Sequence, residues 1–150
     1  MSLPLAVKRQ RPWWAPWRSV DLDGWAVLAA LGPLFASAGG RSASGADGDP
    51  VADLTRLVTW GRPGDAEELS WQGHRLGSQW VVYAGDRGVR EVDVDVWDDF
   101  PDRSLDEFAA ELRLVLAPLH GLAKAGGGRL LADTGDVTDR PLDEIIDLVA

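Results

Sequence analysis

Valines alternate with acidic residues along residues 89–97, and this is the clearest pattern in the chain. A period of two is typical of a strand with one buried face and one solvated face. The valines are Val92, Val94 and Val96, and the acidic residues opposite them are Glu91, Asp93 and Asp95. An apolar stretch at 79–84 comes before, and the sequence GDRG at 85–88 supplies a turn. The pattern therefore predicts an antiparallel hairpin over 79–97.

Four other stretches place hydrophobic residues at helical spacing. They lie at 22–37, at 51–61, after Ser104 and after Pro141. Ser104 and Glu107 have the spacing of a capping box at the start of the third helix. Pro118 is expected to kink or end that helix, and the glycines at 126–128 to stop it.

Further strand patterns complete the expected fold. They occur at 68–76 and 129–133, and residues 3–9 are expected to add an edge strand. Strands in succession with helices on one side indicate an α+β fold. We expect a small antiparallel or mixed sheet of about three to five strands, with helices packed on one face. The hairpin, a crossover helix and a returning strand match half of a ferredoxin-like sandwich.

The composition divides the chain into three parts. Residues 1–38 form a tryptophan-rich arm followed by an apolar helix, and residues 39–50 a flexible Gly/Ser-rich linker or loop. Residues 51–150 hold the remaining helices and strands and are expected to form the α+β domain. A chain of 150 residues suits one domain, with residues 1–38 packed on it.

The residue types exclude several kinds of site. No cysteine is present, which excludes disulfides, thiolate metal sites and cysteine nucleophiles. The two histidines, His74 and His120, have no partner at the spacing of a metal site, and no serine-nucleophile signature occurs. The glycines at 126–128 follow a helix, so they cap it and do not cradle a phosphate. We expect no cofactor.

The charge of the chain is unevenly distributed. The formal net charge is −9, and residues 91–150 carry fifteen acidic against five basic residues, a net charge of −10. Such a field repels nucleic-acid phosphates, which argues against nucleic-acid binding. The same field favours association with a basic protein partner.

Six carboxylates lie between residues 91 and 102, and three interpretations of them are open. They are Glu91, Asp93, Asp95, Asp98, Asp99 and Asp102. The first interpretation is the solvated face of a strand followed by a turn, and the second is a surface that binds a basic partner. In the third, Asp93 and Asp95 join Asp133, at the end of the next strand, to hold Mg²⁺ for phosphoryl transfer. That site lacks a glycine-rich phosphate loop and a nearby lysine.

The sequence RPWWAPWRS at 11–19 gathers three of the eight tryptophans. Its two prolines favour an extended chain. Trp13, Trp14 and Trp17, flanked by arginines, are typical of anchors in protein pockets or at a membrane surface, although we do not favour membrane contact. The alternative is that the segment wraps back and its rings cover the domain's own core.

Residues 8–38 have the outline of a secretory signal, with basic residues, an apolar run and a small-x-small motif at 36–38. Asp21 and Asp23, directly before the apolar run, argue against that interpretation. We therefore expect a retained, buried helix, too short to span a bilayer, in a cytoplasmic protein. The residues expected within the folded domain are Trp25, Leu28, Leu31 and Leu34.

The favoured function is a non-catalytic acidic interaction module that binds a basic protein surface. One version is an inhibitor or immunity-type protein that covers the basic active site of a nuclease. Its expected partner-binding residues are the six carboxylates of 91–102 and the three tryptophans of 11–19. One alternative is a metal-dependent phosphoryl-transfer enzyme that uses Asp93, Asp95 and Asp133. Another is a structural subunit anchored by its tryptophan-rich arm.

Overall fold

The computed structural model describes most of the chain. The described residues are 2–9, 14, 21–38, 50–60, 68–73, 77–85, 88–97, 104–125 and 127–149. Residues 39–49, which contain almost all of the expected linker, lie outside this set, and so does His74.

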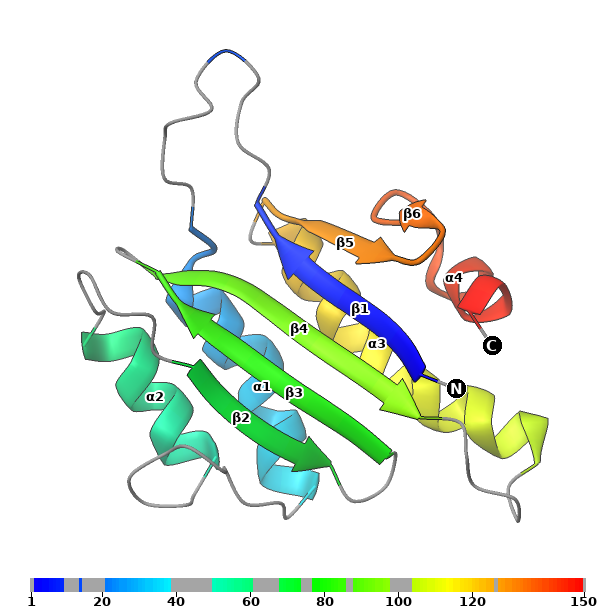
Figure 1. Ribbon diagram of the computed structural model, residues 1–150, viewed down its shortest axis with the longest axis horizontal. Coiled ribbons are helices and arrows are strands. Elements are labelled where there is room, and N and C mark those ends of the chain that lie inside the picture. Colours follow the sequence, from blue (N-terminus) through cyan, green and yellow to red (C-terminus); the bar gives the residue numbers. More distant parts are fainter. Residues whose placement is uncertain are drawn as a thin grey trace.

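One antiparallel sheet forms the first layer of the fold (Figure 1). Its strands are β1 (Ser2–Lys8), β2 (Glu68–Gly73), β3 (Gly77–Ala84), β4 (Val89–Trp97), β5 (Arg129–Ala132) and β6 (Gly135–Asp136). They lie in the order β2-β3-β4-β1-β5-β6, and every neighbouring pair is antiparallel. The expected hairpin is the pair β3 and β4, which meet in continuous register from Gly77 to Tyr83.

Helices form the second layer, on one face of the sheet. They are α1 (Gly24–Ala38), α2 (Pro50–Trp60), α3 (Leu105–Ala125) and α4 (Leu142–Val149). In Figure 1, α1 and α3 lie behind the sheet, α2 lies at the left beside β2, and α4 lies beside α3 near β6. No described helix or strand covers the face of the sheet that is turned to the viewer. The expected α+β class, with helices on one face of an antiparallel sheet, is confirmed.

The expected position of β1 at an edge of the sheet is wrong. β1 lies between β4 and β5, with seven paired residues on the β4 side. Leu5 and Val7 are only 3% and 0% exposed, as suits a central strand. The sheet also has one strand more than the expected upper limit of five, because the two-residue β6 pairs with β5.

Only the second half of the sheet matches the ferredoxin-like pattern. β4 and β5 are parallel to each other, flank β1 and are joined through α3, which is a split β-α-β arrangement. The first half differs, because the chain leaves β1, forms α1 and α2 and then enters the sheet at the far edge as β2. β2 also runs opposite to β1, as the antiparallel pairings require.

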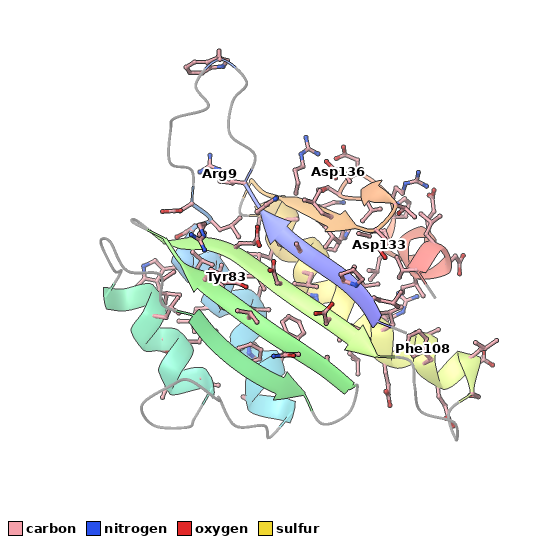
Figure 2. All side chains as sticks on the ribbon, in the orientation of Figure 1. Arg9, Tyr83, Phe108, Asp133 and Asp136 are labelled. Carbon is pink, nitrogen blue, oxygen red and sulfur yellow. The ribbon has the colours of Figure 1, made fainter. Side chains whose placement is uncertain are left out.

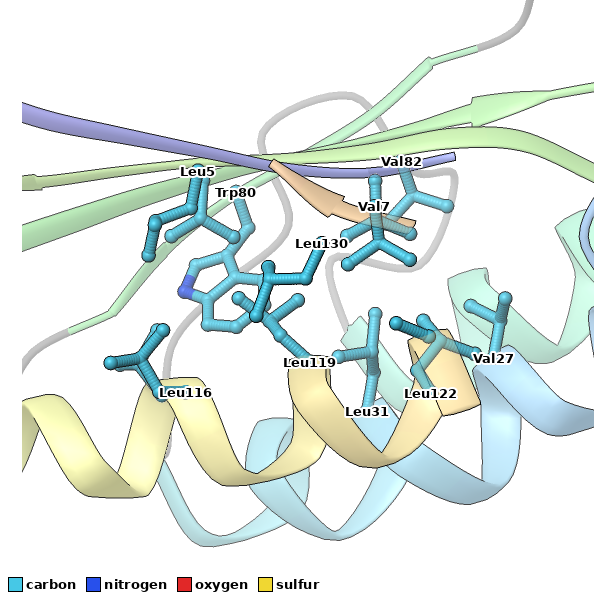
Figure 3. Close-up of a cluster of buried hydrophobic side chains, with 14 of the residues drawn as sticks. Leu5, Val7, Val27, Leu31, Trp80, Val82, Leu116, Leu119, Leu122 and Leu130 are labelled. Atoms are coloured by element: carbon cyan, nitrogen blue, oxygen red, sulfur yellow. The ribbon is translucent and has the colours of Figure 1, made fainter. Parts of the chain in front are cut away.

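The core lies between the sheet and the helices (Figure 3). Trp80 of β3 is fully buried there, and its indole nitrogen donates a hydrogen bond of 3.1 Å to Ser78 Oγ. Phe35 of α1 meets the Trp80 ring edge to face, with ring centroids 5.8 Å apart. Leu116, Leu119 and Leu122 of α3 approach the same cluster from below the sheet in Figure 3. Apolar side chains of α1 and α3 thus meet the buried face of the sheet.

The apolar helix at 24–38 contributes directly to this core. Val27 and Leu31 are fully buried, and Leu28 and Leu34 pack against the core with partial exposure. Trp25 lies in α1, within the folded domain as expected, but 63% of its surface is exposed. It lies at the start of α1, on the side of the helix away from Val27 and Leu31. Across the described residues, no helix is long and apolar enough to cross a membrane.

α3 follows the sequence at its start but not at Pro118. The capping box is confirmed, because the Ser104 backbone nitrogen donates to Glu107 Oε2 at 3.2 Å and the Glu107 nitrogen to Ser104 Oγ at 3.1 Å. Pro118 does not end the helix, which continues to Ala125. Pro118 has no N–H group to donate to the Leu114 carbonyl oxygen. Leu114 lies on the exposed side of the helix, where water can donate to that oxygen instead. Burial of the leucines on the other side holds the helix together.

Candidate functional site

The uncovered face of the sheet carries the acidic residues of β4. Side chains of paired residues on neighbouring strands point to the same face, and alternate residues point away from the helices. We call this surface the open face and define it by Ala6, Lys8, Val81, Tyr83, Glu91, Asp93, Asp95 and Leu131. The three valines of β4 point to the core and are 0%, 1% and 0% exposed, in chain order. The expected division of β4 into an apolar side and an acidic side is therefore confirmed.

The register of the strands gives each acidic residue its own neighbours. Glu91 pairs with Lys8 of β1 on one side and with Tyr83 of β3 on the other. The Lys8 ammonium lies 3.7 Å from a Glu91 carboxylate oxygen. Arg90, which directly precedes Glu91, places its guanidinium 5.3 Å from the centroid of the Tyr83 ring. This end of the open face thus joins acidic, basic and aromatic groups.

Asp93 lies in a less polar row at the middle of the open face. Its cross-strand neighbours are Ala6 and Val81, and Leu131 of β5 pairs with Ala6 in the same row. Asp93 Oδ1 has no accessible surface and no hydrogen-bond partner. Burial, a hydrogen bond with Glu91 and the charge of Glu91 raise the pKa of Asp93 from its ordinary value of 3.8 to about 7. Lys8 acts in the opposite direction but does not outweigh them.

The alternative metal site of Asp93, Asp95 and Asp133 is wrong, because these three carboxylates do not meet. Asp93 and Asp95 lie on β4, whereas Asp133 follows β5, and β1 separates these two strands. Two strand spacings amount to about 10 Å, too far for ligands of one Mg²⁺ ion. Figure 2 shows Asp133 on the far side of β1 from β4. Among the described residues, no three acidic or histidine side chains are placed to hold a metal ion.

Most of the other expected partner-binding residues lie outside the described part of the chain. The residues outside it are Asp98, Asp99, Asp102, Trp13 and Trp17. Trp14 is described; it lies in a turn and is 58% exposed. The structure therefore shows one exposed tryptophan and three acidic residues of the predicted set.

A polar network around Thr138, at the opposite edge of the sheet, was not predicted from the sequence. Thr138 Oγ1 accepts from the Leu130 nitrogen at 2.7 Å and donates to Asp136 Oδ1 at 2.6 Å. His120 Nε2 of α3 lies 3.0 Å from the Thr138 carbonyl oxygen. The side-chain hydrogen bond from Thr138 lowers the pKa of Asp136. The signal available in the sequence is the D-x-T spacing, which is typical of a turn closed by an aspartate side chain.

This network seals the β5 edge of the sheet. Leu130 has its nitrogen bonded to Thr138 Oγ1 and its carbonyl oxygen bonded to the Val137 nitrogen at 3.0 Å. Arg129 pairs with Asp136 at 3.7 Å and with Asp139 at 3.2 Å. We therefore assign the network a structural role, since its groups satisfy one another.

Comparison with known proteins gives no assignment. No family model, no curated protein and no solved structure matches the chain. Its function is therefore inferred from the chemistry of its own residues.

Proposed function

We propose that this chain is a non-catalytic interaction module whose open face binds a basic surface of another protein. The observation that supports this proposal is the row of Glu91, Asp93 and Asp95 on a sheet face that no described element covers. The helices cover the opposite face, so, of the part of the chain that the structure describes, the open face is the sheet surface available to a partner. One version is an inhibitor that covers a basic active site, with carboxylates in place of substrate phosphates.

The composition of the open face suits a protein partner. Val81, Leu131 and Ala6 place apolar surface beside the carboxylates, and Tyr83 and Arg90 add the residue types enriched in interfaces. The half-buried apolar groups favour close contact, while the carboxylates determine which partners are repelled. Such a mixed surface provides both affinity and charge selectivity.

The charge of the C-terminal part favours fast association. Residues 91–150 carry a net charge of −10, which attracts a basic protein before contact. Charges at the rim of an interface act mainly on the association rate, and this effect is screened by salt. Association should therefore slow as the ionic strength is raised.

The experiment compares two variants that each replace two carboxylates by amides, at pH 8, where Asp93 is mostly ionised. In the face variant, Asp93→Asn and Asp95→Asn neutralise the open face. In the control variant, Asp106→Asn and Asp147→Asn remove two exposed charges from α3 and α4. Proteins captured from a lysate of the source cell by the immobilised chain are identified by mass spectrometry, and the association rate of each purified candidate is then measured.

The proposal requires a captured basic protein that distinguishes the two variants. It should associate with the control variant as fast as with the wild type, more slowly with the face variant, and more slowly with the wild type when salt is raised from roughly 50 to 500 mM. A partner that binds both variants equally fast at both salt concentrations would show that the open face is only a solvated surface.

A further inference from the structure

Asp93 differs from the two acidic residues beside it. Glu91 has Lys8 as its cross-strand neighbour, at 3.7 Å, and Asp95 is exposed to water. Asp93 has Ala6 and Val81 as cross-strand neighbours, and neither offers a charge or a hydrogen bond. Its Oδ1 atom is out of contact with water and has no partner. Asp93 is thus an acid in the least polar part of the open face.

The two acidic residues nearest to Asp93 along β4 oppose its ionisation. Glu91 and Asp95 lie on the same face of β4, two residues away in each direction. Lys8 of β1 is the cation that acts on Asp93, and it pairs with Glu91. β3 contributes Tyr83, over whose ring the Arg90 guanidinium lies. Arg129 of β5 lies one strand further away, and it pairs with Asp136 and Asp139. Among the described residues, two acids thus flank Asp93 on this face, and each of the cations near it has another partner.

A hydrogen bond between the carboxyl groups of Asp93 and Glu91 requires a proton on one of them. Burial of Asp93, then this hydrogen bond and the charge of Glu91, raise the pKa of Asp93 to about 7. The Glu91–Asp93 pair therefore changes its charge near neutral pH, in the range where most carboxylates are fully ionised.

We propose that Asp93 is a proton switch in the open face: the Glu91–Asp93 pair holds one proton in the free protein at mildly acidic pH and releases it when a cationic group binds. The ionised pair attracts a cation and the protonated pair does so less, so binding and proton release are linked. The effect on the partner rests on the proposed function, whereas proton uptake by the free chain does not.

The size of the linkage follows from the fraction of chains that are ionised. With a pKa near 7, about one tenth of the pairs are ionised at pH 6 and about nine tenths at pH 8. Affinity for a cation that binds only the ionised pair should therefore rise up to roughly tenfold between these two pH values.

The first test is a titration of the free protein by carbon-13 NMR of its side-chain carboxyl groups. One group should titrate near neutral pH in the wild type and in Asp95→Asn, and this transition should be absent from Asp93→Asn. Ala6→Lys, which places a cation beside Asp93, should lower its midpoint. If every carboxyl group titrates below about pH 5, the switch does not exist.

The second test uses hexalysine with an acetylated N-terminus as a probe, because its side-chain ammonium groups stay charged between pH 6 and pH 8 and the α-amino group, which would titrate in this range, is blocked. Calorimetry at pH 7 in two buffers of different ionisation enthalpy measures the protons released on binding. The wild type should release a fraction of a proton and bind more tightly at pH 8 than at pH 6, whereas Asp93→Asn should release none and bind equally at both.

A wild type that binds hexalysine without proton release, or that does not bind it at either pH, would overturn the linkage to binding. Failure of the proposed function has a different signature, because there the physiological partner ignores the face variant even though Asp93 titrates near neutral pH in the free chain.

Discussion

At the scale of single residues, Asp93 and Gly88 show how close neighbours restrict what a position accepts. Asp93 is an acid among apolar groups, so its charged form is costly in the folded chain. Gly88 is a position without room, because a Cβ atom there would lie 2.3 Å from the Leu22 backbone oxygen. In both cases a neighbouring strand or bridge imposes the restriction, and the local sequence does not.

The first prediction concerns the pH dependence of stability. The pKa of Asp93 is raised from 3.8 to about 7 in the folded chain, so the folded state binds a proton more tightly than the unfolded state. Its contribution to stability is complete below pH 3.8 and is lost as the pH rises toward 7. Asp93→Asn should therefore match the wild type near pH 4 and exceed it at pH 8, by about 1 kcal/mol once partial exposure is allowed for.

Urea denaturation at several pH values measures this difference. Asp95→Asn, at the exposed neighbouring site, is the control and should show a much smaller dependence on pH. A constant difference between Asp93→Asn and the wild type from pH 4 to pH 8 would contradict the prediction.

The second prediction concerns Gly88. Leu22 and Val89 form a two-hydrogen-bond bridge, with N···O distances of 2.7 and 3.1 Å, and a methyl group at Gly88 would force it apart. Gly88→Ala should lower the free energy of unfolding by about 2 kcal/mol or more, the value of two lost hydrogen bonds. Gly121→Ala is the matched control, because nothing lies within 4 Å of the added atom and alanine favours the helix. Thermal melting of the two variants should shift in opposite directions.

At the scale of elements, the short β6 and the turn after it protect the end of the sheet. β5 is only four residues long, and its outer edge is bonded through Leu130 to Val137 and Thr138. Thr138 is buried despite its hydroxyl group because that group both accepts and donates a hydrogen bond. β6 pairs with Leu131 and Ala132, and the Thr138 side chain extends this cover of the β5 edge to Leu130.

The third prediction follows from this role of Thr138. Thr138→Val keeps the shape of the side chain but leaves the buried Leu130 N–H without its acceptor, so the free energy of unfolding should fall by about 1–3 kcal/mol. Thr138→Ser keeps the hydroxyl group and should lose less. The hydrogen bond from Thr138 also lowers the pKa of Asp136, and this contribution disappears as the pH falls through that pKa.

The destabilisation by Thr138→Val, measured by urea denaturation, should thus be larger at pH 7 than at pH 3. Equal stability of Thr138→Val and the wild type at pH 7 would show that the turn does not hold the β5 edge.

At the scale of the whole molecule, β1 connects the two halves of the sheet. It pairs with β4 on one side and with β5 on the other. Within the sheet, β1 therefore joins the strands β2, β3 and β4 to the strands β5 and β6. α3 makes the second connection, since it contacts α1, β1 and β5. The N-terminal strand is therefore as central to the fold as the hairpin.

The fourth prediction tests this central position by hydrogen exchange. The amides of Leu5, Val7 and Val94 should exchange at rates close to that of global unfolding, because their strands have a partner on both sides. The amide of Gly135 in β6, in an exposed two-residue strand, should exchange much faster. Fast exchange along β1 would contradict the central placement of this strand.

Elements with a strong local pattern can be predicted from the amino-acid sequence alone. The hairpin at 79–97, the capping box at Ser104 and the helix after Pro141 all follow from periodicity and local hydrogen bonding, which depend on residues close together in the chain. The acidic side of β4 was determined for the same reason. The α+β class follows from the order of these elements.

Which strands are neighbours, and what surrounds each acidic residue, depends on contacts between distant parts of the chain. β1 belongs between β4 and β5 because its burial depends on partners about 85 and 125 residues away, which no local pattern records. The same placement separates Asp133 from Asp93, which excludes the alternative metal site. It also puts the apolar Ala6 beside Asp93, whose burial raises its pKa. The sequence predicted where the carboxylates lie on their strand; their protonation depends on the strands beside them, because burial and neighbouring charge act through space.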